Sequence, residues 1–309
     1  MRRPIHGILL LDKPPGLTSN GALQRVKRLF NAKKAGHTGS LDPIATGMLP
    51  ICFGEATKFS QFLLDSDKSY YVVAKLGERT NTGDTEGEVV EKLPVVNVTT
   101  TRVEEVMTKF LGEIDQIPPM FSAIKVQGQA LYELARRGIE IERKSRRIKI
   151  FSLAMESLTE ETLSFRVHCS KGTYVRTLVE DIGRELGCGA HVIELRREMV
   201  APYGNTKMYT MAALEAIIAS TGMTGLYECL LPIETSVQGF PAVKLSTSAA
   251  FYMRTGQPVR APFEVGCSLV RLTTEDEKFL GMGEAMPDGR IKPHRLISSH
   301  DVVMTNTGT

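Results

Sequence analysis

The chain has 309 residues, of which 42% are hydrophobic and 24% are charged, and its net charge is +3. This length allows about two domains, and the composition is that of an ordinary globular protein, not of a disordered or fibrous chain. No segment approaches the roughly 18–20 consecutive apolar residues of a membrane span. The amino terminus has no apolar stretch typical of a signal peptide, so a cytoplasmic protein is expected.

Several ligand classes lose support because their motifs are missing. Neither G-x-x-x-x-G-K-[ST] nor G-x-G-x-x-G occurs, so nucleotide triphosphates and dinucleotides are not indicated. The five cysteines are odd in number, widely spaced and never arranged as Cys-x-x-Cys, which argues against a disulfide framework. Cys188 and His191 have a spacing that suits one metal ion, but no second pair accompanies them. We expect a packed thiol, a helix-end imidazole and no metal site.

The chain is predicted to begin with a buried strand and a basic helix. The apolar run over 7–12 predicts a strand, which the Pro-Pro-Gly turn at 14–16 ends. Ser19 is expected to cap a helix whose apolar residues over 23–30 have helical spacing. The outward side of this helix and its exit form a basic ridge of five residues, Arg25, Lys27, Arg28, Lys33 and Lys34. This ridge is either a solvated surface or a basic approach to the next loop.

The middle of the chain mixes strands and helices irregularly. Strands are predicted over 68–76, 147–157 and 162–169, a loop over 79–88, and helices near 55–64, 102–110, 130–137 and 174–186. From about residue 240, short strand-like pieces separated by Gly, Pro and Asp turns indicate a small all-β domain. The predicted fold class is therefore α+β, with a first domain over 1–239 and a second over 240–309.

Asp42 is the first candidate for chemistry. It lies in a Gly-rich loop over 36–50, and Pro43 restricts its backbone away from the helical region. Aspartate before proline is also a common turn, in which the carboxylate bonds to nearby amides. The local pattern alone leaves both a turn residue and a catalytic carboxylate open.

Four blocks of the sequence resemble the motifs of the TruB-type family of pseudouridine synthases. The blocks are ILLLDKPPGLTSN at 8–20, GHTGSLDPIATGMLP at 36–50, KSYYVVAKLG at 68–77 with TNTGD at 80–84, and HCSKGTYVRTLVEDIG at 168–183 extended by CGAHVIELRR at 188–197. They occur in the family's order and spacing and cover essentially the whole chain. The resemblance implies a mixed, largely antiparallel sheet with flanking helices, followed by a PUA-like domain.

The resemblance implies roles for individual residues. Asp42 resembles the nucleophile of all pseudouridine synthases, and Arg176 resembles the arginine that pairs with it. Tyr70 resembles the tyrosine that stacks on the target base near its C5. Leu195 matches an apolar residue lining the pocket, and His37 matches a histidine that takes part in extruding the target nucleotide.

These residue types suit the reaction that the family implies. Uracil is detached from C1′ of ribose, rotated and rejoined through C5; nothing is added, so no cofactor is expected. A carboxylate can attack or deprotonate the sugar, and a paired arginine keeps it ionised. A nearby phenol is one candidate base for the C5 proton, and a stacked base must first be flipped out.

The same residues also have simpler explanations. Tyr70 could pack in the core, although Tyr71 is the better candidate for that position. Arg176 could bond Glu180 one turn along its helix, and His37 could be a loop imidazole. Lys13 matches a lysine of the first block and is expected to have a structural role.

The implied partner is tRNA, through its T-arm stem-loop, with uridine 55 as the target. Residues 116–147 resemble the family's thumb-like insertion, and 240–309 resemble a PUA-type RNA-binding domain. Phosphates are expected to contact the basic run Arg143, Lys144, Arg146, Arg147 and Lys149, which is otherwise a solvated surface. A monomer with no obligatory protein partner and no membrane association is expected.

Two other functions are compatible with the same scaffold. One is a non-catalytic tRNA-binding or tRNA-folding chaperone, against which the intact Asp42 and Tyr70 argue. The other is a guide-RNA-dependent pseudouridine synthase, which would act with partner proteins. The thumb-like segment and the short tail favour a stand-alone enzyme.

Overall fold

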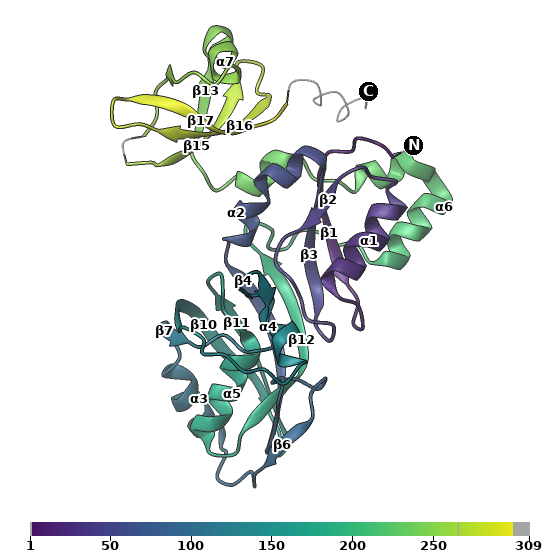
Figure 1. The fold of residues 1–309 in the computed structure, drawn as a ribbon, viewed down its shortest axis with the longest axis vertical. Coiled ribbons are helices and arrows are strands. Elements are labelled where there is room, and N and C mark those ends of the chain that lie inside the picture. Colours follow the sequence, from purple (N-terminus) through teal and green to yellow (C-terminus); the bar gives the residue numbers. More distant parts are fainter. Residues whose placement is uncertain (1, 265, 299–309) are drawn as a thin grey trace.

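The structure of the chain is a computed structural model that describes residues 2–264 and 266–298. Figure 1 shows a larger body built around one sheet and a smaller body built around a second sheet. The architecture changes between residues 237 and 242, and the last part of the predicted 240–309 domain lies outside the described residues. The α+β class predicted from the sequence is confirmed.

The elements of the two bodies follow one another along the chain. The larger body contains β1 (Gly7–Lys13), α1 (Ser19–Leu29), β2 (Ala35–His37), β3 (Thr46–Phe53), η1 (Gly54–Phe59), α2 (Ser60–Leu64), β4 (Lys68–Leu76), β5 (Glu78–Thr80), β6 (Val89–Lys92), α3 (Thr100–Thr108), β7 (Gly112–Gln116), β8 (Lys125–Val126), β9 (Gln129–Ala130), α4 (Leu131–Ala135), β10 (Arg146–Leu158), β11 (Thr162–Cys169), α5 (Val175–Leu186), β12 (Ala190–Val200), α6 (Met211–Glu228) and η2 (Ile233–Val237). The smaller body contains β13 (Ala242–Leu245), α7 (Thr247–Arg254), β14 (Val259–Arg260), β15 (Leu269–Thr274), β16 (Phe279–Ala285) and β17 (Arg290–Leu296).

The large sheet has eight strands in the order β1-β3-β12-β4-β11-β10-β7, with β2 added on β3. Most neighbours are antiparallel, but β12 runs parallel to β3 on one side and antiparallel to β4 on the other. Strand β12 therefore joins two halves of the sheet, one built from the start of the chain and one from its middle.

Strands that are buried on both faces differ in sequence from strands that bury mainly one face. Residues 8–11 of strand β1 are covered on both faces and are all apolar: Leu9 and Leu11 face the main core, while Ile8 and Leu10 face a second cluster with Met48. Strand β4 alternates between buried and half-buried positions, and β11 buries its predicted face.

Several predicted boundaries are corrected by the structure. The cap of α1 is Thr18, whose hydroxyl accepts from the amide of Gly21 at 3.0 Å, and Ser19 is the first helical residue. Strand β5 extends into the predicted loop over 79–88 and pairs with β6. Strands β3, β7 and β12 and helix α6 were not predicted. The smaller body also carries a helix, α7, beside its five strands.

An aromatic interface joins the two bodies. Phe59 packs against Phe279 with ring centroids 5.5 Å apart, and Phe62 meets Phe240 at 5.3 Å. Lys58 adds a hydrogen bond from its ammonium group to the carbonyl of Leu296 at 3.1 Å. Because such contacts combine buried rings with a polar bridge, they fix the smaller body on the η1 and α2 side of the larger one.

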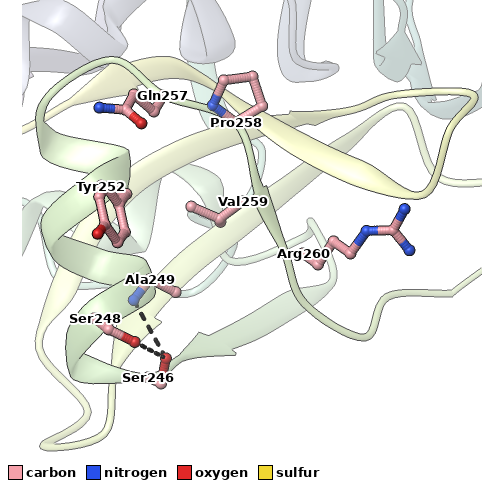
Figure 2. Close-up of a pocket in the computed structure, with 8 residues that line it drawn as sticks. All are labelled: Ser246, Ser248, Ala249, Tyr252, Gln257, Pro258, Val259 and Arg260. Carbon is pink, nitrogen blue, oxygen red and sulfur yellow. Dashed lines mark hydrogen bonds between the residues drawn. The ribbon is translucent and has the colours of Figure 1, made fainter.

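The smaller body has a pocket between α7 and residues 257–260, and Figure 2 shows Tyr252 and Arg260 among its lining residues. Four of the cysteines are buried, and no disulfide is found within the described ranges. Across residues 2–264 and 266–298, no helix combines the length and apolar character needed to span a membrane.

Candidate active site

Asp42 and Arg176 meet in an ion pair, although they come from distant parts of the chain. The Nε of Arg176 lies 2.9 Å from Oδ2 of Asp42, and its Nη1 lies 3.4 Å from Oδ2 of Asp84. The side chain of Asp42 is 37% exposed, whereas those of Arg176 and Asp84 are only 6% and 2% exposed. One carboxylate therefore faces the solvent from a buried charge network.

Arg176 is held by more than its two carboxylates. It is the second residue of α5, and its guanidinium donates to the carbonyl of Thr82 at 2.8 Å and to the carbonyl of Phe121 at 2.7 Å. Phe121 belongs to the predicted thumb-like segment, so that segment contacts the site through its backbone. The alternative pairing of Arg176 with Glu180 is not the one found.

Asp84 positions the other side of the arginine. Its carboxylate accepts from the hydroxyl of Thr82 at 2.7 Å and from the amide of Glu86 at 3.0 Å. No role was predicted for Asp84 from the sequence, although Asp84 is the last residue of the TNTGD block. A buried carboxylate needs such partners, because an unpaired charge away from water is strongly disfavoured.

Burial raises the pKa of Asp42 above the ordinary value of 3.8. The positive charge of Arg176 opposes this shift most, the negative charge of Asp84 adds to it, and Lys13 opposes it further. The ionised form of Asp42 thus depends on Arg176. As the pH is lowered, activity that needs the carboxylate is expected to be lost at a higher pH than it would be with an ordinary aspartate.

Two side chains from the first block fix the loop that carries Asp42. Lys13 is fully buried, and its ammonium donates to the carbonyls of Pro14 at 2.9 Å, Leu17 at 2.7 Å and Pro43 at 3.3 Å. Burial lowers the pKa of Lys13 to about 8. These contacts agree with the structural role expected for Lys13.

Ser19 ties the start of α1 to the same loop. Its hydroxyl accepts from the amide of Leu41 at 2.7 Å and donates to the carbonyl of Leu41 at 3.0 Å. The first turn of α1 and the residue before Asp42 are therefore fixed to one another.

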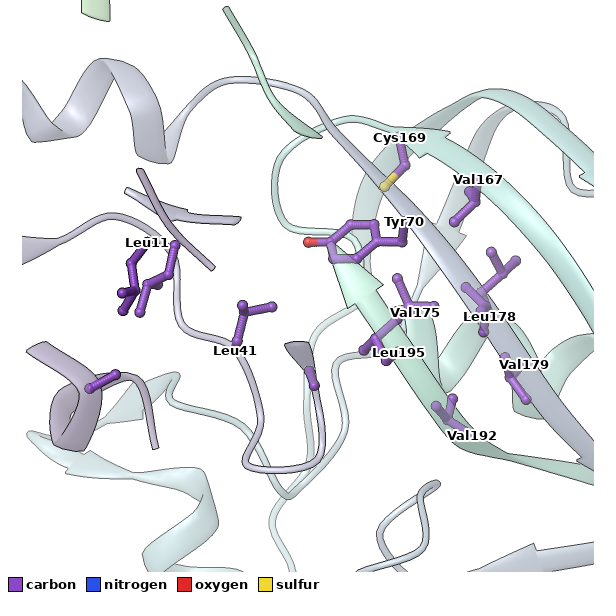
Figure 3. Packing of buried hydrophobic residues seen from close by; sticks show 14 of the residues in the cluster. Leu11, Leu41, Tyr70, Val167, Cys169, Val175, Leu178, Val179, Val192 and Leu195 are labelled. Atoms are coloured by element: carbon purple, nitrogen blue, oxygen red, sulfur yellow. The ribbon is translucent and has the colours of Figure 1, made fainter. Parts of the chain in front are cut away.

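Tyr70 and Leu195 lie on adjacent strands at one wall of the site. Tyr70 is 8% exposed and Leu195 5% exposed. Figure 3 shows the Tyr70 hydroxyl directed away from Val167, toward the part of the chain that carries Leu41. The expectation that Tyr71 would be the core residue was wrong: Tyr71 is half-buried and lies under the guanidinium of Arg166 at 5.5 Å.

Burial raises the pKa of Tyr70, and the nearby charge of Arg197 opposes the rise. The phenol is therefore neutral at physiological pH. A neutral ring can stack on a base at any working pH, but it can accept a proton only if it passes its own proton on in the same step.

Arg197 is the second residue that sequence analysis missed. It is 1% exposed, and its guanidinium donates to the carbonyls of Met48 at 2.7 Å and Gly39 at 3.0 Å. Its backbone pairs with Tyr70 on one side and with Gly47 on the other. Gly47 has φ +94°, and a Cβ there would lie 2.2 Å from the carbonyl oxygen of Arg197, so only glycine fits.

His37 lies at the end of β2, half-buried, on the strand that leads into the Asp42 loop. Burial lowers its pKa, and the charge of Arg197 lowers it further, so the imidazole is neutral at pH 7. Within the described residues its Nδ1 has no hydrogen-bond partner. A neutral ring of this kind can stack or accept a hydrogen bond.

The basic run is only partly free for phosphates. Arg147 forms ion pairs with Glu113 at 3.8 Å and Asp115 at 3.0 Å, and Arg143 lies 3.3 Å from Glu140. The remaining members are exposed and have no acidic partner in the described ranges, namely Lys144, Arg146 and Lys149.

The Cys188 and His191 pair has no sign of a metal centre. Cys188 is a buried free thiol. His191 lies inside β12, not at a helix end as expected, and its Nδ1 is 3.1 Å from the carbonyl oxygen of Glu78. No cluster of metal-ligating side chains is found among the described residues.

Comparisons with known proteins match most of the chain. The family model described as "TruB family pseudouridylate synthase (N terminal domain)" matches residues 27–175. Models described as "tRNA pseudouridylate synthase B C-terminal domain" and "Pseudouridine synthase II TruB, C-terminal" match 176–238 and 241–297. A protein of Coxiella burnetii (strain RSA 331 / Henzerling II), named "tRNA pseudouridine synthase B", is 54% identical over 296 residues, which are 96% of each chain.

The chain belongs to the TruB family of pseudouridine synthases. A relative from Ectopseudomonas mendocina (strain ymp) with the same name is 53% identical over 96% of this chain and 97% of its own. The chain is therefore an enzyme, an isomerase that converts uridine to pseudouridine.

Solved structures agree with this assignment. A chain in "Crystal Structure of a Cbf5-Nop10-Gar1 Complex" has a TM-score of 0.72 and 28% identity, covering 91% of this chain and 78% of that one. A chain in "Structure of H/ACA RNP bound to a substrate RNA containing 2'-deoxyuridine" has a TM-score of 0.74 at 24% identity, covering 96% and 86%, and shows the shared fold.

Replacing Tyr70 with Phe tests the phenol of this TruB-family enzyme. We expect RNA affinity close to that of the wild type, because the phenylalanine ring can still stack. We expect a single-turnover rate about 10²-fold lower or more, because phenylalanine has no hydroxyl for the proton transfer in which Tyr70 is a candidate. Tyr70→Leu is the companion variant, expected to lose affinity as well. A Tyr70→Phe variant with the wild-type single-turnover rate would make the residue a stacking platform alone.

Proposed function

We propose that the chain isomerises uridine 55 in the T-loop of tRNA to pseudouridine, with Asp42 as its covalent catalyst. The observation that carries the proposal is the half-exposed carboxylate of Asp42, paired with the buried Arg176 at 2.9 Å. The names of the relatives support tRNA as the substrate.

The geometry supports a sequence of steps in which no atom is gained. The ionised Asp42 acts on the ribose, as a nucleophile at C1′ or as a base, while the bond between N1 and C1′ breaks. Uracil leaves with the electron pair of that bond and rotates. C5 then bonds to C1′ as the bond between Asp42 and C1′ breaks or, where Asp42 acted as a base, as Asp42 returns its proton to the ribose, so that the carboxylate is free again. The proton on C5 is then lost, and N1 takes up a proton. Arg176 supports the first step because it favours the charged carboxylate.

The side chains around the Asp42 loop support base flipping as the way the uridine reaches Asp42. Tyr70 offers a ring for stacking, Leu195 an apolar wall beside it, and His37 a neutral imidazole at the mouth of the loop. A base that leaves the T-loop stack loses stacking energy, which such aromatic and apolar contacts return.

We also assign RNA contacts outside the cleft. Lys144, Arg146 and Lys149 stand at the base of the thumb-like segment with charges free to meet phosphates. In the smaller body, Tyr252 and Arg260 both line the pocket of Figure 2, and aromatic and guanidinium groups are side chains that bind RNA nucleotides. In this proposal the enzyme acts as a monomer.

The deciding experiment uses purified protein and a T-arm hairpin transcript, with no guide RNA and no partner protein. Pseudouridine-specific chemical labelling, followed by mass spectrometry of the digested RNA, should locate one modified uridine in the loop. A chaperone without catalysis would bind the hairpin and leave every uridine unmodified. Conversion only after a guide RNA is added would assign the chain to the guided enzymes.

Metal removal is expected to leave the reaction intact, since carboxylate, guanidinium and phenol supply the chemistry. After dialysis against EDTA, the rate on a prefolded hairpin in monovalent salt should stay within about twofold of the untreated rate. A true loss of a catalytic metal would be easy to detect, because even a tenfold fall in rate corresponds to a change of only about 1.36 kcal/mol in the barrier. The prefolded hairpin avoids any need for Mg²⁺ in RNA folding. A loss of rate that zinc alone restores would instead point to Cys188 and His191.

A further inference from the structure

The basic ridge is a group of positive charges without counter-charges. Arg25, Arg28, Lys33 and Lys34 are exposed, and Lys27 is half-buried. No member of the ridge forms an ion pair within residues 2–264 and 266–298. The polar contact of Arg28 is with a backbone carbonyl, that of Gln24 at 3.3 Å. The sequence from Lys13 to Leu41 contains no acidic residue.

The amino terminus adds two more charges to the ridge. The amide of Arg3 donates to the carbonyl of Asn31 at 2.8 Å, and the amide of Lys33 donates to the carbonyl of Arg3 at 2.9 Å. The exposed Arg2 and Arg3 therefore lie alongside Lys33. Seven like charges on α1, its exit and the adjoining amino-terminal residues repel one another, so a polyanion that approaches them is attracted strongly.

The ridge contrasts with the basic run at 143–149. There, Arg147 already meets Glu113 and Asp115, and Arg143 meets Glu140. A phosphate that binds those arginines must displace a carboxylate, whereas a phosphate at the ridge displaces only water and mobile ions. The ridge is thus the larger source of salt-dependent binding energy.

The position of the ridge selects the part of the RNA that reaches it. Ser19, at the start of α1, is bonded to Leu41 next to Asp42. At about 1.5 Å per residue, Arg25 lies about 9 Å and Arg28 about 14 Å farther along the helix. At the other end, Lys34 directly precedes β2, which leads back to the same loop.

We propose that the basic ridge, together with Arg2 and Arg3, binds the phosphate backbone of the double-helical stem directly below the T-loop. The inference rests on the proposed function, because it takes the target uridine to be at Asp42. At about 9–14 Å along α1 from the residue bonded to Leu41, the ridge is expected to lie beyond the loop phosphates nearest that uridine, and we assign it to the phosphates of the first base pairs of the stem. Contacts of this kind position the RNA and carry no sequence information.

The test compares two variants of equal net charge. The ridge variant carries Arg25→Gln, Arg28→Gln, Lys33→Gln and Lys34→Gln. The control variant carries Lys92→Gln, Lys109→Gln, Arg184→Gln and Lys244→Gln, all of which are exposed residues that already have acidic partners. Glutamine is a good helix former, so α1 should fold, and circular dichroism with thermal melting verifies this for both proteins.

The expected result concerns the slope of log K against log salt for the T-arm hairpin. Each neutralised phosphate adds about 0.7–0.9 to this slope, so the ridge variant, in which three phosphates are no longer neutralised, should have a slope lower by about 2–3. The control variant should keep the wild-type slope, and both should keep the wild-type single-turnover rate at saturating RNA. A third variant, Lys144→Gln with Arg146→Gln and Lys149→Gln, measures the share of the thumb base.

An unchanged slope in the ridge variant would overturn the proposal. A lower slope with intact tRNA but not with the hairpin would place the ridge against another part of the tRNA and overturn the stem assignment. Measurements on the wild-type protein distinguish failure of the proposed function from failure of the ridge proposal. If the wild type binds the hairpin with a steep salt slope but modifies no uridine, the proposed function fails, while phosphate binding by the ridge is still supported.

Discussion

Asp42→Asn is expected to fold, to bind the T-arm hairpin with wild-type affinity and to lose isomerisation by a factor on the order of 10⁴ or more. Asparagine keeps the shape of aspartate and still accepts a hydrogen bond from Arg176, but it carries no negative charge. It therefore can neither attack C1′ nor take a proton from the ribose. The single-turnover rate with excess enzyme is the measurement.

The control for this variant is Asp65→Asn, which changes an exposed aspartate bonded to Lys171 at 3.0 Å. It should keep the wild-type rate. The assignment of Asp42 fails if Asp42→Asn retains activity within tenfold of the wild type after the protein has been freed of deamidated material.

Arg176→Gln is expected to lower the single-turnover rate by about 10²–10³-fold, the usual cost of removing one preorganised charged donor. Both Asp42 and Asp84 lose their partner, so the melting temperature should also fall, because a buried charge left unpaired is strongly destabilising. Arg184→Gln is the matched control, because Arg184 is exposed, lies on the same helix and pairs with the half-buried Asp181; it should change neither quantity.

The pH profile separates a catalytic arginine from a structural one. Arg176 holds the pKa of Asp42 down against burial, so its loss raises that pKa further. Because the carboxylate must be ionised, the acid limb of the rate profile should move to higher pH in Arg176→Gln. A variant that melts at a lower temperature but keeps the wild-type acid limb would show that Arg176 acts on stability alone.

The sheet was predictable where only one face of a strand is apolar. Over 162–169 the alternation predicts both the strand and its buried face, and β11 has both. Over 68–76 it predicts the strand but not the face, because Tyr70 with Val72 and Tyr71 with Val73 form two equally apolar rows. Only the register with Arg197 on β12 decides which tyrosine lies at the site.

Two helices were missed for different physical reasons. In α6 the apolar residues surround the helix, and Gly222 breaks the helical backbone with φ 67°, so no one-sided stripe exists in the sequence. In α7 the aromatic residues Phe251 and Tyr252 are 63% and 49% exposed, so the apolar residues of this helix do not form a single buried stripe.

A pattern of residue types along the sequence does not say which distant residues of the candidate site contact one another. Asp42 and Arg176 are distant in sequence, and only the resemblance to known motifs paired them; the structure brings them to 2.9 Å. Asp84 and Arg197 were missed because charged residues are mostly exposed. Both are buried here because other parts of the chain provide their partners, and such partners are visible only in three dimensions.

Strand β12 contains two residues more than its partner β4 needs. Val192 pairs with Ala74 and Glu194 with Val73, so Ile193 is a bulge, and Glu198 is a second one between Arg197 and Met199. The register between these two bulges sets which face of the sheet Leu195 and Arg197 occupy. A slip of this stretch by one residue would turn both side chains to the opposite face although every residue of the site remained present. The length of this segment is consequently under tighter constraint than its chemistry, and diverging relatives should exchange residues here far more readily than they gain or lose one.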